Sequence, residues 1–290
     1  MAPGAAEENR VQDFTGKVAV ITGGAHGIGL AMAQRFARDG MKIVIGDIEA
    51  PRLEEAERSL AAAGADVRAL VMDVTVPEQM QALADLAVDA YGGVHVFCNN
   101  AGVAGGGLEW EMPLSTWEFV LGVNLWGVIH GIRTFVPLLM KQDAAHIVNT
   151  ASVAGLVAPP FMSPYNATKH AVVAISESLF HELALVGSNV KVSVLCPAWV
   201  NTGIGSSERN RPEHLREQIA EDQNAALSGI IQGYLDAGMS PDEVADHVVR
   251  AIVDERFWIL THQGDEWMAA VGARLDSVRD RTNPVPSALG

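Results

Sequence analysis

Ser152, Tyr165 and Lys169 have the residue types and the spacing needed to move a proton on a small molecule. Tyr165 and Lys169 are four residues apart, so on a helix they lie on one face. An ammonium group beside a phenol favours the phenolate, which would lower the pKa of Tyr165 from its usual value of about 10. Tyr165 would then be a usable acid and base. Ser152 ends an apolar run, where its hydroxyl could hydrogen-bond a substrate oxygen.

A glycine-rich loop, Thr22 to Gly29, follows the first apolar run of the chain and opens a helical pattern at Ile28. Gly23 permits a tight turn, Gly27 lets the backbone approach a pyrophosphate, and Gly29 allows close packing of helix on strand. The helix N-terminus would present free N–H groups to the phosphates. By itself the loop could also be a turn without a ligand, just as a Tyr-x-x-x-Lys pair could be part of a solvated helix face.

Asp47 ends the second apolar run, 18 residues after Gly29. Dinucleotide-binding folds place an acid at this spacing against the ribose hydroxyls, where it would also repel a 2′-phosphate. We therefore expect NAD as the cofactor, with NADP less favoured. His26 is the competing influence, because a cation beside the loop could help to bind an extra phosphate; alternatively it is an exposed turn residue.

Two further strand ends carry candidate cofactor contacts, Asp73-Val74 and Asn100-Ala101-Gly102. Asn side chains tie neighbouring loops together, and a small residue followed by glycine leaves room for a flat cofactor. Ordinary turn chemistry would also account for both segments. Their agreement with the glycine loop and with Asp47 favours the cofactor interpretation.

Short apolar runs alternate with helical patterns along most of the chain, which predicts an α/β fold with a doubly wound parallel sheet of about seven strands and helices on both faces. The predicted strands are Val18–Thr22, Lys42–Gly46, Val67–Met72, Val94–Asn99, His146–Ala151, Val190–Leu195 and Phe257–Thr261. The predicted helices include Gly29–Asp39, Pro51–Ala63, Pro77–Tyr91, Ser115–Met140 and Ser163–Leu185.

No Pro- or Ser-rich linker divides the chain, so we expect a single domain over residues 14–280 between an N-terminal tail (1–13) and a C-terminal tail (281–290). Residues 203–239 carry helix formers but no strand. They follow the sixth strand, whose carboxyl end faces the ligand crevice of such a sheet, and they predict a helical lid over the substrate.

The net charge of −15 disfavours nucleic acid and anionic membranes as partners. Residues Met1 to Asn9 contain no apolar run, so we expect neither a secretory signal nor a transit peptide and place the protein in the cytoplasm. Charged and glycine residues interrupt the apolar runs, which argues against a membrane span. Cys98 and Cys196 are expected to be reduced core residues. No motif has metal-ligand spacing, so no metal is predicted.

The order of these motifs resembles the short-chain dehydrogenase/reductase family, in its shorter single-domain type, from Lys17 to about Thr261. The resemblance implies that Asn124 completes a catalytic tetrad by holding a water that connects Lys169 to solvent. It also implies that Lys169 binds the nicotinamide ribose. Further cofactor contacts are expected after the sixth strand, at Pro197, Val200 and Thr202.

Ala198 departs from this resemblance, because the family usually has Pro-Gly where this chain has Pro197-Ala198. A methyl group there requires a backbone that avoids positive φ or accepts strain. The expectation for Val200 and Thr202 is weakened accordingly. Trp199 could be either a core anchor or a wall of the pocket.

The resemblance implies hydride transfer between the nicotinamide and a secondary alcohol or ketone. The segments expected near the nicotinamide contain no Arg or Lys, which favours a hydrophobic substrate over a carboxylate or phosphate: Val103–Trp110, Val153–Phe161 and Trp199–Ile204. An epimerase or dehydratase on a similar fold and a non-catalytic NAD-binding sensor are the alternatives. The long amphipathic helices and the resemblance predict a homo-oligomer, a tetramer or a dimer.

Overall fold

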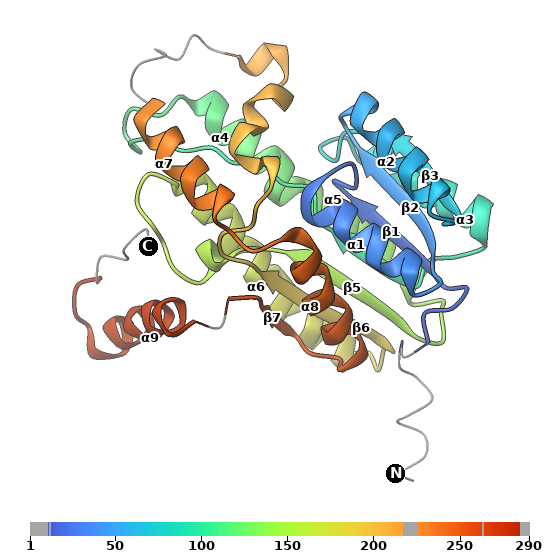
Figure 1. The fold of residues 1–290 in the computed structure, drawn as a ribbon. Helices are drawn as coiled ribbons and strands as arrows, with labels where there is room; N and C mark the ends of the chain where they lie inside the picture. Colours follow the sequence, from blue (N-terminus) through green and yellow to red (C-terminus); the bar gives the residue numbers. More distant parts are fainter. Residues whose placement is uncertain (1–10, 12, 217–224, 263, 285–290) are drawn as a thin grey trace.

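A seven-stranded parallel sheet runs through the part of the chain that the computed structural model describes, residues 11, 13–216, 225–262 and 264–284. The strand order is β3-β2-β1-β4-β5-β6-β7, so the chain starts near the middle and winds outward in both directions (Figure 1). The strands are β1 (Val18–Thr22), β2 (Lys42–Asp47), β3 (Val67–Val71), β4 (Val96–Asn99), β5 (Ala145–Thr150), β6 (Val190–Cys196) and β7 (Trp258–Leu260). The predicted doubly wound fold is confirmed.

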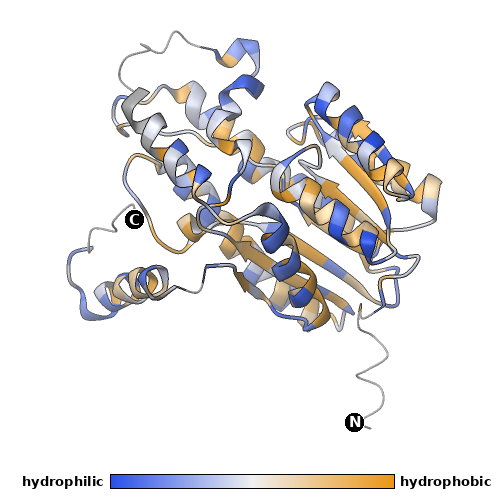
Figure 2. Ribbon diagram, in the orientation of Figure 1, coloured by the Kyte–Doolittle hydropathy of each residue, from blue (hydrophilic) through white to orange (hydrophobic). Residues whose placement is uncertain are grey.

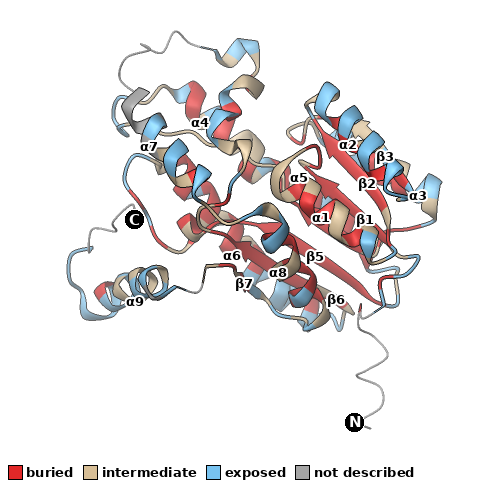
Figure 3. Ribbon diagram, viewed as in Figure 1, coloured by how far each residue is buried: buried red, intermediate tan, exposed pale blue. Residues whose placement is uncertain are grey.

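Alternate residues of the central strands pack into two separate cores, which explains why the runs are apolar without interruption. In β1, Ala19 and Ile21 belong to the core under α1 and α8, whereas Val18 and Val20 belong to the core on the opposite face. All five residues of β1 are buried. Figures 2 and 3 show the strands as the most apolar and most buried layer of the molecule.

Helices cover both faces of the sheet. The helices α1 and α8 pack against one another on one face, and α3 packs against α5 on the other. Their bounds are α1 (Gly27–Arg38), α2 (Ala50–Ala62), α3 (Pro77–Tyr91), α4 (Leu114–Leu121), α5 (Gly127–Leu139), α6 (Ser163–Leu185), α7 (Ala225–Asp236), α8 (Pro241–Val253) and α9 (Asp265–Asp280). The last helix, α9, has no counterpart among the helical segments predicted from the sequence.

The segment predicted as one helix over Ser115–Met140 is two α-helices joined by a π-helical turn, η1 (Gly122–Trp126). By length and composition, Leu114–Leu139 could also cross a membrane. In the fold it instead contacts α6, α3 and the sheet strands β4 and β5. Packing within this domain therefore accounts for part of its apolar surface, while Leu114 and Trp126 stay exposed.

The structure adds detail at the start of the predicted domain and within the predicted lid. Val11 and Phe14 are buried in the core around β1 and α1, so the packed domain reaches back beyond residue 14. Within the predicted lid, residues 203–210 and 213–215 form 3₁₀ turns, η3 and η4, and α7 follows. The lid residues 217–224 lie outside the described part of the chain.

Candidate active site

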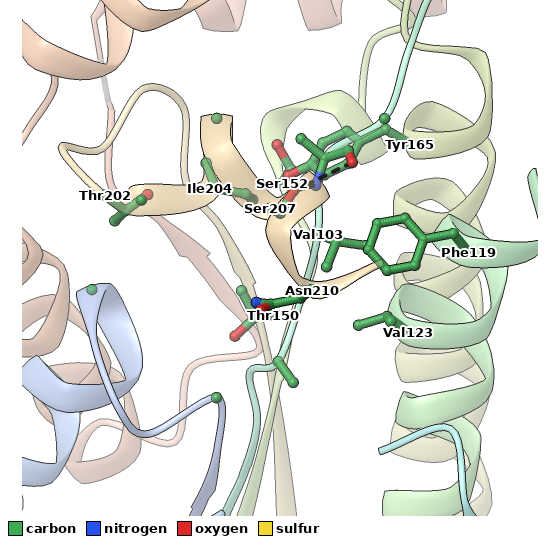
Figure 4. A pocket seen from close by; sticks show the side chains of 18 of the residues that line it. Val103, Phe119, Val123, Thr150, Ser152, Tyr165, Thr202, Ile204, Ser207 and Asn210 are labelled. Carbon is green, nitrogen blue, oxygen red and sulfur yellow. Dashed lines mark hydrogen bonds between the residues drawn. The ribbon is translucent and has the colours of Figure 1, made fainter. Parts of the chain in front are cut away.

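A cavity of about 740 Å³ opens at the carboxyl ends of the strands. Figure 4 shows that its walls come from segments far apart in the sequence, with Ser152 and Tyr165 on one side and lid residues such as Ile204 and Ser207 close by. Of the residues that sequence reasoning predicted for the site, all but Gly29 and Asn124 line this cavity. The predicted residues that do line the cavity are Gly23, His26, Gly27, Ile28, Asp47, Asp73, Val74, Asn100, Ala101, Gly102, Ser152, Tyr165, Lys169, Pro197, Val200 and Thr202.

Tyr165 and Lys169 lie on the first turns of α6, and both are buried. The Nζ atom of Lys169 is 5.4 Å from the centre of the Tyr165 ring and donates a hydrogen bond of 2.8 Å to the carbonyl of Thr150. Ser152 follows the same strand, β5, by two residues, and its Oγ accepts a hydrogen bond from the Ala154 N–H. The Ser152 hydroxyl donates to the carbonyl of Pro197 at 3.2 Å. The end of β5 therefore positions both the serine and the lysine.

The pKa of the Tyr165 phenol differs from the value that the sequence suggested. Burial raises this pKa above its usual value, and the hydrogen bond with Ser152 offsets only part of the rise. Burial also lowers the pKa of Lys169 to about 8, because the surroundings disfavour its charged form. A raised pKa favours the protonated phenol at neutral pH, which is the form needed to donate a proton.

Asn124 is fully buried and lies in the π-helical turn. Its side chain clamps one residue, because Oδ1 accepts from the Val103 N–H at 2.8 Å and Nδ2 donates to the Val103 carbonyl at 2.9 Å. A Cβ on Gly102 would lie 3.5 Å from Asn124 Oδ1 and 3.7 Å from Lys169 Nζ, so the space beside Gly102 adjoins both side chains. The geometry gives Asn124 a positioning role on the segment after β4; a water held by Asn124 stays a prediction.

The glycine loop has the backbone geometry that a bound pyrophosphate requires. Gly23 and Gly27 have positive φ angles of 65° and 57°, and a Cβ on Gly29 would lie 2.0 Å from the carbonyl oxygen of Gly23. Side chains are therefore excluded at all three positions. No side chain caps the N-terminus of α1, which leaves its first N–H groups available to an anion.

Asp47 is nearly buried at the end of β2, where its two oxygens bind the loops on either side. Oδ2 accepts from the Ala25 N–H at 3.0 Å, and Oδ1 accepts from the Glu49 N–H at 3.0 Å. Each carboxylate oxygen has a second lone pair, so Asp47 can still accept bonds from two ribose hydroxyls. The loop and Asp47 together fit the phosphate and adenosine parts of a dinucleotide.

Asn100 ties the end of β4 to the glycine loop. Its Nδ2 donates to the carbonyl of Thr22 at 3.0 Å, and its backbone N–H donates to Thr22 Oγ1 at 3.0 Å. Asp73 Oδ1 accepts from the Thr75 N–H, so it holds the turn after β3 at the cavity wall. The strand ends thus both line the cavity and connect its loops.

Ala198 causes no strain, since positive φ angles at described residues other than glycine occur only at Phe161, Glu255 and Arg281. Its N–H instead lies 3.2 Å from His262 Nδ1. Trp199 is a cavity wall and stacks on Tyr234 with ring centres 5.2 Å apart. Thr202 lies against the glycine loop, because its Cγ2 would be 3.1 Å from a Cβ on Gly27.

The sequence did not reveal which lid residues bind to the segments around the cavity. Ser207 Oγ accepts from the Ala104 N–H at 2.8 Å, and Arg209 forms an ion pair with Glu49 in which Nη2 is 2.6 Å from Oε1. The partners are separated by 103 and 160 residues, and no local pattern marks such contacts.

The sequence also contains no sign that Phe161 has an unusual backbone conformation. It lines the cavity with φ of +64°, a conformation that costs a bulky residue free energy. The Phe161 carbonyl accepts from the Gly107 N–H at 2.8 Å and sits where a Cβ on Gly106 would be, which holds two cavity loops together.

Among the described residues no group of three His, Cys, Asp or Glu side chains could hold a metal ion.

Comparisons with known proteins agree with this geometry. The family model of the short chain dehydrogenases matches residues 17–213. A CLA biosynthesis dehydrogenase/reductase of Lactiplantibacillus plantarum is 34% identical over 257 residues, 87% of this chain and 90% of that protein. A 1-deoxy-11-beta-hydroxypentalenate dehydrogenase of Streptomyces avermitilis is 39% identical over 247 residues, 84% of each chain. A crystal structure from Burkholderia phymatum, a short chain dehydrogenase/reductase in complex with NAD, has 45% identity and a TM-score of 0.92, covering 95% of this chain and 99% of that one.

Proposed function

This chain belongs to the short-chain dehydrogenase/reductase family, and on that premise we propose that it transfers a hydride between NAD and a hydrophobic secondary alcohol or ketone. The observation that carries the proposal is the convergence of Ser152, Tyr165 and Lys169 on the wall of the cavity that the glycine loop and Asp47 also line. Such a site places a proton donor and the features of a dinucleotide-binding fold at the same crevice.

Each catalytic residue has a separate task in the proposed reaction. Bound NADH supplies the hydride, and NAD accepts it in the reverse direction. The Ser152 hydroxyl rotates its hydrogen from the Pro197 carbonyl to the substrate oxygen and stabilises charge there. Tyr165 donates its phenolic proton to that oxygen during reduction and accepts it during oxidation. Lys169, anchored on Thr150, supplies positive charge beside the phenol and favours the phenolate once the proton has left.

NAD is favoured over NADP by the carboxylate of Asp47 in the cavity. A 2′-phosphate bound beside it would place two anions within a few ångströms, and at about 4 Å their repulsion costs on the order of 1 kcal/mol or more. The NAD complex of the Burkholderia phymatum relative is consistent with this choice.

The proposed substrate is apolar around its reacting carbon. Apolar side chains from several elements line the cavity: Val103 after β4, Phe119 on α4, Phe161 and Met162 before α6, Trp199 after β6, and Ile204 and Leu235 in the lid. Glu118 also lines the cavity and would repel an anionic group, whereas Glu208 is paired with Arg211. A secondary alcohol or ketone on a hydrocarbon frame fits such a wall. We place the reaction in the cytoplasm.

The experiment that tests the proposal is a turnover assay of the purified chain with NAD and NADP against a panel of secondary alcohols, and with the reduced cofactors against the matching ketones. Hydride transfer to NAD from at least one hydrophobic alcohol supports it. Binding of NAD with no turnover of any panel member would favour the non-catalytic sensor instead. Product of inverted configuration or of water loss, without net NADH formation, would favour the epimerase or dehydratase reading.

A further inference from the structure

Glu49 lies at the centre of a charged cluster beside the cofactor cavity. Its carboxylate accepts hydrogen bonds from Arg209 Nη2 at 2.6 Å, Arg209 Nε at 3.1 Å and Asn210 Nδ2 at 3.0 Å. Arg52 Nε is 3.3 Å from the same carboxylate. His26 Nε2 lies 3.2 Å from Glu49 Oε1 and 3.1 Å from Arg209 Nη2. Two arginines and a histidine therefore face one carboxylate.

Glu49 is held as an anion at any ordinary pH. Burial opposes its ionisation, but the hydrogen bonds from Arg209 and Asn210 and the charges of Arg209 and Arg52 outweigh burial and lower the pKa to about 2. The carboxylate therefore keeps its negative charge beside the two guanidinium groups throughout the ordinary pH range.

The cluster is continuous with the ribose end of the cavity. The backbone N–H of Glu49 donates to Asp47 Oδ1 at 3.0 Å, and both His26 and Arg209 line the same cavity as Asp47. Arg209 comes from η3 of the lid, so the lid brings a guanidinium next to the position where a 2′-phosphate would extend.

Every donor nitrogen of Arg209 already has an acceptor. Nε and Nη2 bind Glu49, while Nη1 binds the carbonyls of Gly203 and Ser206 and the Ser206 hydroxyl. A guanidinium recognises a phosphate best through two parallel N–H bonds. The two N–H groups best suited to that task are the ones that Glu49 occupies.

We propose that Glu49 is a second determinant of cofactor choice: it occupies two N–H groups of the Arg209 guanidinium and pairs with Arg52, and so denies a 2′-phosphate the donor groups that would bind it. The inference rests on the proposed NAD-linked function and extends it. Asp47 repels the 2′-phosphate directly, whereas Glu49 removes the positive partners. The His26 side chain, which the sequence suggested as an aid to NADP binding, contacts Glu49 and Arg209 in the same cluster.

The test is calorimetric binding of adenosine 2′,5′-bisphosphate and of 5′-AMP to the purified full chain, two probes that differ only in the 2′-phosphate. Glu49→Gln should improve the ratio of the two dissociation constants at least tenfold in favour of the bisphosphate, and Glu49→Ser should repeat the shift. Glu54→Gln, an exposed glutamate on α2, removes the same charge at a distance and should leave the ratio unchanged. Adding Arg209→Met to Glu49→Gln should abolish most of the gain.

An unchanged ratio in both Glu49 variants would overturn the inference, as would an equal weakening of both probes, which is the signature of a loosened lid alone. Persistence of the gain in the Glu49→Gln, Arg209→Met double variant would also overturn it. These outcomes are distinct from failure of the proposed function, because that failure would appear in the wild-type chain, either as no binding of NADH and 5′-AMP or as binding of NAD with no turnover of any alcohol.

Discussion

The ammonium group of Lys169 lies 5.4 Å from the centre of the Tyr165 ring while its hydrogen bond goes to the Thr150 carbonyl, 2.8 Å away. The lysine is therefore anchored on the strand β5, with its ammonium group beside the Tyr165 ring. Thr150 ends β5 two residues before Ser152, so one strand end sets the positions of the charge and of the serine hydroxyl. Mutations of Ser152, Tyr165 and Lys169 can therefore test the proposed role of each residue separately.

Replacing Tyr165 with Phe should lower kcat for ketone reduction by roughly 100- to 10,000-fold, because the proton donor is lost while the ring keeps its packing. NADH affinity and the melting temperature should change little. Steady-state kinetics, fluorescence titration with NADH and thermal melts check the three expectations. Near-normal turnover in this variant would remove Tyr165 from its proposed role.

Replacing Lys169 with Met should change how stability depends on pH. The pKa of Lys169 is about 8 in the folded chain against 10.5 for the free side chain, so between these values the unfolded chain binds more protons. The stability of the wild type should therefore rise relative to Lys169→Met as pH increases from about 8 to above 10, by on the order of 3 kcal/mol. At neutral pH the buried charge is a cost that methionine lacks.

Denaturant unfolding of both proteins near pH 7 and near pH 10 measures this difference. Lys141→Met, at an exposed lysine, is the matched control and should show a much smaller change. A stability difference between wild type and Lys169→Met that stays constant with pH would contradict the lowered pKa.

Replacing Asp47 with Ser should narrow the preference for NAD over NADP, measured as the ratio of kcat/KM values, by tenfold or more. The ribose contacts and the repulsion of the 2′-phosphate are lost together. Asp89→Ser, on the exposed side of α3, changes net charge equally and should leave the ratio as it is. Wild-type protein that uses the two cofactors equally would refute the argument from Asp47.

Replacing Phe161 with Gly should separate strain from substrate contact. Loss of the ring should raise KM for a hydrophobic ketone several-fold in both Phe161→Gly and Phe161→Ala. Only alanine keeps the Cβ that makes φ of +64° unfavourable, so the glycine variant should be more stable than the alanine variant by about 1 kcal/mol. Equal KM values for wild type and both variants would remove Phe161 from the substrate wall.

Light scattering at micromolar concentration should give a mass that is a multiple of 30.8 kDa, a dimer or a tetramer. Trp126 and Leu114 on the α4–α5 segment and Leu185 at the end of α6 are exposed, Leu185 by 86%, which is unusual for large apolar side chains on long helices. Trp126→Glu should lower the mass, whereas Val88→Glu on α3 should not. A monomer at all concentrations would contradict the expected oligomer.

The strands and the meeting of Ser152, Tyr165 and Lys169 at one cavity could be predicted because their signals are local. Continuous apolar runs mark buried parallel strands, and the spacing of Tyr165 and Lys169 is a property of one helix. The raised pKa of Tyr165 could not be predicted, since it depends on burial by residues distant in sequence. The pairing of Glu49 with Arg209 was equally hidden, because 160 residues separate the partners.

The π-helical turn Gly122–Trp126 is equivalent to one residue inserted into a regular helix. A regular helix rotates by about 100° per residue, so α4 and α5 face directions that differ by one such step from those of an uninterrupted helix. Asn124, which clamps Val103, lies within this turn. In an alignment of related chains, a one-residue gap within this segment is therefore a chemical difference: in a homologue with the gap, the asparagine would be rotated relative to the rest of the helix, away from the residue that it clamps here.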